Sequence, residues 1–168
     1  MAETEIAYEK APIRTTTRHV PPEWIDYNGH MNVAYYTMAF DQAADEIFEG
    51  VLKIGENLVR EHRMGPMALQ TQIHYLGELL EGGAFHCEFQ VLDADPKRVH
   101  FFMTMINGET GQPAATYESL TMNVDLEARR SAPYPDAAQE RIQRLTAAHA
   151  GLPRPAQAGN RLGIRSNT

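Results

Sequence analysis

One long amphipathic helix limits the possible folds of this chain more than any other feature of the sequence. From Val33 to Val51, apolar residues recur at spacings of three and four, and most acidic residues lie between them. Such spacing places the apolar side chains on one face of an α-helix. Asn32 directly precedes the run and can cap the unpaired amides of the first turn. The predicted apolar face consists of Val33, Tyr36, Phe40, Ala43, Ile47 and Val51.

Around this helix the sequence alternates with a period of two, which is typical of strands. Residues 13–20 are rich in threonine and valine and are followed by two prolines, so we expect a first strand there. The mixed segment 52–65 has room for a short helix. Four more strands are expected at residues 67–75, 85–91, 99–105 and 120–126. The short turns between consecutive strands predict an antiparallel meander.

The predicted fold class is α+β. An antiparallel sheet of about five strands needs a cover for its apolar face, and only the long helix is large enough. We therefore expect the sheet to wrap around one central helix. The length of 168 residues fits a single domain, which we assign to residues 1–150, with an N-terminal arm and a second helix at 136–150. The Pro-, Gly- and Arg-rich residues 151–168 are expected to form a mobile tail.

Charge and composition exclude several classes of partner. The formal net charge of −7 argues against a nucleic-acid partner, which would need a basic surface. No apolar run approaches the roughly 20 residues of a bilayer span, and no secretory signal is apparent. The single cysteine, Cys87, rules out an intrachain disulfide and suits a cytoplasmic protein. Because sheet edges need a partner, we expect a homodimer, with a tetramer left open.

The polar residues that could carry chemistry gather between Trp24 and Asn32, directly before the long helix. A helix N-terminus offers unpaired N–H groups and about half a positive charge, which can polarise a carbonyl. A carboxylate beside it, Asp26, could act as nucleophile or general base. The same residues also permit a purely structural interpretation, in which Asn28-Gly29 is only a turn and Asn32 only a cap. The pattern alone leaves both interpretations open.

The segment 26–32, DYNGHMN, resembles the signature loop of hotdog-fold acyl-CoA thioesterases of the 4-hydroxybenzoyl-CoA thioesterase type. Asp26 matches the catalytic carboxylate of that family, and Met31 stands where many members have valine. Within the family, PPEWIDYNGHMN, DPKRVHFF and NVDLEARRSAPYP are similar to betainyl-CoA thioesterases of carnitine breakdown. The other loop residues that match the motif are Asn28, Gly29, His30 and Asn32.

This resemblance implies a hotdog fold and hydrolysis of an acyl-CoA, with betainyl-CoA as one candidate substrate. It also implies that His30 and Asn32 hold the loop and the carboxylate of Asp26 in place. Active sites would lie at the interface of two subunits. Coenzyme A is then part of the substrate, and we expect no cofactor and no metal, because the histidines show no metal-ligand spacing.

Two further groups of residues are candidates for substrate binding. Arg63, Lys97 and Arg98 lie in predicted loops and suit the phosphates of CoA, although each also fits an ordinary solvated turn. Four aromatic residues lie near the loop and could hold a quaternary ammonium group through their ring faces, or could simply pack in the core. These four are Trp24, Tyr27, Tyr35 and Tyr36.

Two alternatives keep the fold and change the function. The first is a non-catalytic module that binds acyl-CoA or an acyl carrier, and a carboxylate at the helix mouth argues against it. The second is a hotdog enzyme of the enoyl-CoA hydratase kind, whose Asp/His signature DYNGHMN does not resemble. A serine hydrolase is disfavoured because the sequence has no GxSxG motif.

Overall fold

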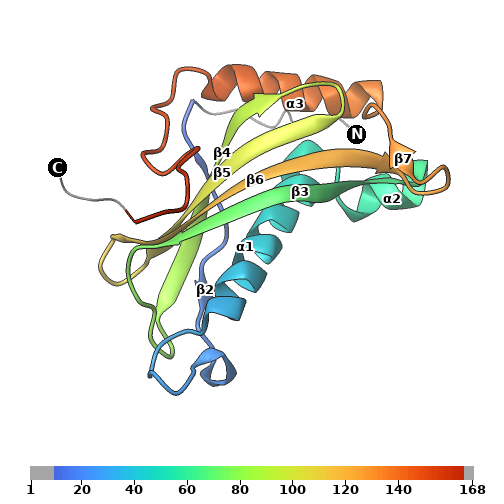
Figure 1. The fold of residues 1–168 in the computed structure, drawn as a ribbon. Helices are drawn as coiled ribbons and strands as arrows, with labels where there is room; N and C mark the ends of the chain where they lie inside the picture. The colour runs from blue at the N-terminus through green and yellow to red at the C-terminus, as the bar shows by residue number, and fades with distance from the viewer. Residues whose placement is uncertain (1–9, 165–168) are drawn as a thin grey trace, which may run out of the picture.

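The computed structural model describes residues 10–164 and contains an antiparallel sheet crossed by one long helix (Figure 1). The helices are α1 (Val33–Ile47), α2 (Glu56–His62) and α3 (Asp136–His149), with a 3-10 turn at Pro22–Trp24 and a π-helical turn at Phe48–Leu52. The strands are β1 (Ile13–Arg14), β2 (Arg18–His19), β3 (Met64–Tyr75), β4 (Ala84–Ala94), β5 (Arg98–Asn107), β6 (Pro113–Asp125) and β7 (Arg130–Ser131). The predicted α+β class is therefore confirmed.

The order of strands in the sheet is β1-β4-β5-β6-β3, with β2 beside β4 and β7 beside β6. The predicted meander is wrong at one point, because β3 pairs with β6 and not with β4. The connection at residues 76–83 explains the difference. It is too long for a tight hairpin, and it buries Leu79 completely next to α1, where the Leu79 carbonyl accepts the N–H of Met31 at 2.8 Å. As a result, β3 lies at an edge of the sheet.

The predicted first strand is split into β1 and β2, which both pair with β4. Thr15 lies between them, and its hydroxyl accepts the backbone N–H of Cys87 at 3.0 Å, in place of a regular ladder bond. Each of the four long strands begins before its predicted first residue. These differences leave the face that covers α1 unchanged.

The core forms where α1 packs against the sheet. Tyr36, Phe40, Ala43 and Ile47 are buried as predicted, whereas Val33 in the first turn is 56% exposed. The ring of Phe40 stacks on that of Tyr117 in β6, with centroids 5.1 Å apart. This packing fixes the N-terminus of α1 at the end of the sheet where β3 ends and the 76–83 connection begins (Figure 1).

The C-terminal segment lies on the other face of the sheet. Glu118 neighbours Tyr117 in β6, so its side chain points away from α1, and its Oε2 accepts the N–H of Gly159 at 2.7 Å. Gln72 in β3 donates to the carbonyl of Asn160 at 2.6 Å. Gly159 and Asn160 therefore contact the sheet, and the mobility expected for residues 151–168 stays a prediction that falls partly outside the described residues. Within residues 10–164, no helix has the length and hydrophobicity to span a bilayer.

Candidate active site

The loop at residues 24–32, here called the Asp26 loop, folds back on itself and returns the chain to the start of α1. The N–H of Asp26 donates to the carbonyl of His30 at 3.1 Å, and the N–H of Gly29 donates to the carbonyl of Asp26 at 3.0 Å. Gly29 has a φ of +81°, which favours glycine over any other residue. Ile25 and Met31 pair across the base of the loop. The fold of the loop thereby places Asp26 next to the residue that caps the helix.

The carboxylate of Asp26 is half-buried and receives two hydrogen bonds from its own loop. Its Oδ1 accepts the backbone N–H of Asn28 at 2.8 Å, and its Oδ2 accepts the side-chain amide of Asn32 at 3.0 Å. The Oδ1 of Asn32 accepts in turn the N–H of Ala34 at 3.0 Å. One carboxamide thus connects the carboxylate to the first turn of α1. A carboxylate has about four acceptor positions, so capacity remains for a substrate or a water molecule.

The first turn of α1 is a suitable donor site for a carbonyl oxygen. In a helix, the first N–H groups have no partner within the helix itself. Ala34 and Tyr35 direct theirs to Asn32, whereas the N–H of Val33 has no acceptor in the part of the chain that the structure describes. The first turn holds no acidic side chain. The positive end of the helix dipole therefore faces the region beside Asp26.

A cleft of about 440 Å³, here called the α1 cleft, opens at this helix terminus. It is lined by His30, Met31, Val33, Tyr36, Tyr75, Gly77 and Glu78. The hydroxyl of Tyr36 donates to the carbonyl of Gly77 at 3.3 Å. The rings of Tyr36 and Tyr75 meet edge to face, with centroids 5.3 Å apart and planes at 84°. Burial raises the pKa of both tyrosines, so both phenols remain neutral at physiological pH.

His30 contacts Asp26 only through its backbone carbonyl. The Nδ1 atom of its imidazole lies 3.3 Å from Oε2 of Glu78, a residue of the 76–83 connection. Glu78 is not among the site residues predicted from the sequence. Its only signal is an acidic residue in a connection between two strands, which on its own is an ordinary solvated position.

The four predicted aromatic residues do not form one group. Trp24 and Tyr35 stack on each other, with centroids 5.2 Å apart and planes at 8°, and neither lines the α1 cleft. Tyr27 is 96% exposed at the tip of the loop. Tyr36 alone of the four lines the α1 cleft, together with Tyr75, which we had assigned only to a strand.

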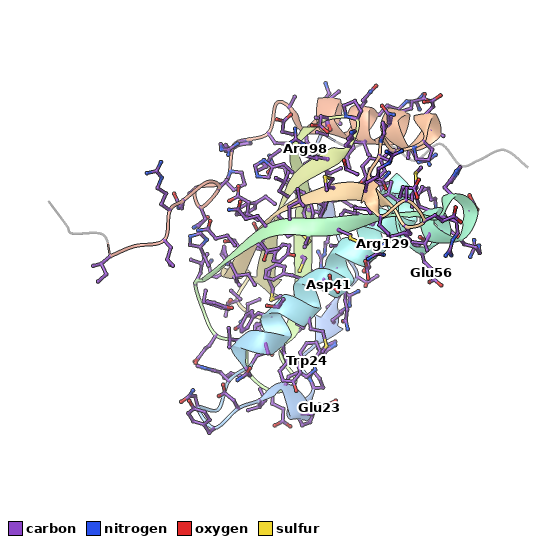
Figure 2. The ribbon with its side chains drawn as sticks, turned by 45° about the vertical axis from the view of Figure 1, so that its right-hand side comes forward. Glu23, Trp24, Asp41, Glu56, Arg98 and Arg129 are labelled. Carbon is purple, nitrogen blue, oxygen red and sulfur yellow. The ribbon has the colours of Figure 1, made fainter. Side chains whose placement is uncertain are left out.

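The three predicted CoA-binding cations lie at the far end of the sheet from Asp26. Arg63 directly precedes the 12-residue strand β3, and Tyr75 at the other end of this strand lines the α1 cleft. The length of the strand, roughly 35 Å, therefore separates Arg63 from the α1 cleft. Figure 2 shows Arg98 at the opposite end of the molecule from Trp24. Arg98 pairs with Asp95 at 2.6 Å, and Lys97 accepts the N–H of Asn123 through its carbonyl. A single chain does not bring these cations to the Asp26 loop.

No metal site accompanies the loop. Over residues 10–164, no three His, Cys, Asp or Glu side chains are grouped so that they could hold an ion. That a bound cofactor is unnecessary stays a prediction.

Comparison with known proteins places this site in a family. Residues 20–142 match the model of the thioesterase-like superfamily. A betainyl-CoA thioesterase of Pseudomonas aeruginosa is 32% identical over 152 residues, which cover 89% of this chain and 94% of that protein. An L-carnitine dehydrogenase/betainyl-CoA thioesterase of a Rhizobium species is 35% identical over 155 residues. That match covers 90% of this chain, which spans only about 30% of the length of that relative.

Solved structures agree with the sequence relatives. A Staphylococcus aureus protein solved in complex with CoA superimposes with a TM-score of 0.83 at 26% identity, covering 94% of this chain and 98% of that one. A putative thioesterase of Pseudomonas putida gives a TM-score of 0.78 at 25% identity, with coverage of 92% and 98%. The fold, the loop and these matches agree: this chain belongs to the thioesterase-like superfamily.

Proposed function

We propose that this chain hydrolyses an acyl-CoA thioester to CoA and a small carboxylic acid. The observation that carries the proposal is the carboxylate of Asp26, held by Asn28 and Asn32 beside the N-terminus of α1. Membership of the thioesterase-like superfamily supports it, as does the likeness to a structure solved with CoA.

In this proposal the thioester carbonyl directs its oxygen at the first turn of α1. The N–H of Val33 is the available donor for the negative charge that develops on that oxygen. Asp26 then acts in one of two ways. It attacks the carbonyl carbon, so that the C–S bond breaks, CoA leaves as thiolate and water hydrolyses the mixed anhydride. Alternatively, it takes a proton from a water molecule that attacks the same carbon, and the proton passes to the departing sulfur.

We further infer a homodimer that forms along β3. This strand has one free edge, and three of its large apolar side chains, Met67, Leu69 and Tyr75, are between 40% and 50% exposed. Unpaired strand edges favour pairing with a second copy. If the two copies of β3 ran antiparallel about a twofold axis, the Arg63 end of one would lie beside the Tyr75 end of the other. That arrangement would bring the predicted cations of one subunit to the active site of its partner.

For the acyl group we propose betaine, because two kinds of relative carry the name betainyl-CoA thioesterase. A cytoplasmic location is proposed because Cys87 is the single cysteine of the chain, so the chain does not depend on an intrachain disulfide.

An assay of thiol release over a panel of acyl-CoA esters, with betainyl-CoA included, tests the function. We expect turnover of at least one ester by the wild type. Binding of CoA esters in calorimetry without thiol release would replace hydrolysis by a binding module. Loss of enoyl absorbance without thiol release would point to a hydratase.

A further inference from the structure

The α1 cleft has a composition that thioester hydrolysis itself does not explain. Of the residues that line it, Glu78 is charged and acidic, and none is lysine or arginine. Two tyrosine rings line the same cleft and meet edge to face at nearly a right angle, and this pair is here called the corner. Thioester hydrolysis by Asp26 requires neither the carboxylate of Glu78 nor the two tyrosine rings. These groups are therefore available for recognition of the acyl group.

The position of this corner suits an acyl group of short reach. Tyr36 lies three residues after Val33 on the same side of α1, about 4.5 Å along the helix axis. In the proposed reaction the thioester carbonyl sits against the amide of Val33. A group attached one carbon beyond that carbonyl would therefore come close to Tyr36, which lines the α1 cleft together with Tyr75 and Glu78.

The rings are held in place by contacts that do not involve substrate. The Tyr36 hydroxyl donates to the carbonyl of Gly77, the residue before Glu78, which fixes the ring relative to the acidic side chain. Oε2 of Glu78 contacts His30 at 3.3 Å, and this contact holds the carboxylate at the rim of the α1 cleft. Aromatic faces attract cations, most strongly when the cation is desolvated, and a nearby carboxylate adds to that attraction.

We propose that Glu78, Tyr36 and Tyr75 form the specificity site for a quaternary ammonium group carried by the acyl chain. This inference rests on the proposed thioester hydrolysis and goes beyond it by naming the residues that select the substrate. Asp26 and the first turn of α1 would act on any thioester, and the corner would favour a cationic acyl group over a neutral one of the same shape. A quaternary ammonium group has no N–H and cannot donate hydrogen bonds, so ring faces and a carboxylate are the groups suited to recognise it.

The test compares two esters that differ in one atom. Betainyl-CoA carries a trimethylammonium group, and 3,3-dimethylbutanoyl-CoA carries the same shape with carbon in place of nitrogen. For Glu78→Gln we expect the ratio of kcat/KM for the cationic ester to that for the neutral ester to fall about tenfold or more, where tenfold corresponds to about 1.4 kcal/mol. The value for the neutral ester should stay within about threefold. Glu81→Gln is the matched control, since Glu81 is exposed in the same connection and does not line the α1 cleft.

A second pair of variants tests the aromatic wall. Tyr75→Leu removes the ring and should lower the same ratio by about threefold or more, whereas Tyr75→Phe keeps the ring and should leave the ratio unchanged. Tyr75 is 49% exposed, so both variants should fold.

The outcomes separate this inference from the proposed function. Equal losses on both esters in Glu78→Gln would mean that Glu78 only positions His30, and the inference would be overturned. A wild type that hydrolyses the neutral ester and prefers it would also overturn the inference, while thioester hydrolysis would stand. Failure to release thiol from either ester or from the wider panel would overturn the proposed function itself.

Discussion

Asn32 joins the stability of α1 to the geometry of Asp26, and two substitutions can separate these roles. Its Oδ1 caps the N–H of Ala34, and its Nδ2 donates to the Asp26 carboxylate, each at 3.0 Å. Serine is as good an N-cap as asparagine but is too short to reach Asp26, whereas alanine removes both interactions. A hydrogen bond to a charged group contributes about 1.5–3 kcal/mol, which corresponds to roughly a 10- to 150-fold change in rate when it positions the reacting group.

We therefore expect Asn32→Ser to lower kcat/KM by roughly 10- to 150-fold while it keeps the cap on the first turn of α1. Asn32→Ala should show the same loss of activity and an additional destabilisation of about 1 kcal/mol, seen as a fall of about 2–4 °C in melting temperature. Thiol release measures the first effect and thermal unfolding the second. Wild-type activity in Asn32→Ser would show that Asn32 is only a helix cap. Equal destabilisation by both substitutions would show that serine does not replace the cap.

Four further outcomes follow from the structure. Asp26→Asn should lose about 100-fold or more in kcat/KM while it keeps the wild-type melting temperature, and activity within tenfold of wild type would remove Asp26 from the mechanism. Asp26→Asn and Arg63→Ala subunits refolded together should regain activity, because in a mixed dimer one site combines the intact Asp26 of one subunit with the intact Arg63 of the other. No recovery of activity would show that Arg63 does not act at the partner's site. Burial raises the pKa of the Cys87 thiol to about 12, so a disulfide reagent at pH 8 should modify it only after denaturation, and rapid modification of the native protein would contradict its burial. Burial lowers the pKa of His149, whose Nδ1 accepts the N–H of Val91. As the pH falls, the imidazole is therefore protonated in the unfolded state before it is protonated in the folded state, so the free energy of unfolding should decrease below about pH 6.5. Urea unfolding at pH 7 and pH 5 should show a smaller difference in His149→Gln than in the wild type.

The helix and the strands could be predicted because each depends on local periodicity. The spacing from Tyr36 to Ile47 places those side chains on one face, and the structure buries that face. The order of the strands could not be predicted in the same way, because periodicity says that a segment is a strand and not which strand lies beside it. The 76–83 connection was expected to be a short turn, whereas the structure buries Leu79 of this connection completely and pairs β3 with β6. The predicted hotdog fold and family are nonetheless confirmed. They could be predicted because the residues of the motif are contiguous in sequence.

The residues of the candidate site likewise differ in whether the sequence alone could indicate that they interact. Asp26, Asn28 and Asn32 are at most six residues apart, so a motif could indicate that they interact. Glu78 lies 48 residues after His30 in the chain, and no spacing rule connects the two. Tyr75 likewise looks like any residue of a strand until the fold places its ring on Tyr36. The residues that we propose to perform the chemistry were therefore visible in the sequence, whereas two of the three that we propose to select the substrate, Glu78 and Tyr75, were not.

Charge is distributed unevenly between the two ends of β3. One end of the strand has a carboxylate and aromatic rings and no cation in its cleft, and the other end begins beside Arg63. CoA carries several phosphate charges, so a chain that acted alone would have to bind the acyl end roughly 35 Å from Arg63. An antiparallel pair along β3 removes this conflict, because each partner would supply the end that the other lacks. If CoA binds across such a pair, formation of the dimer is required for CoA binding. A charged substitution at Leu69 on the free edge should then raise KM for the acyl-CoA by a larger factor than it lowers kcat.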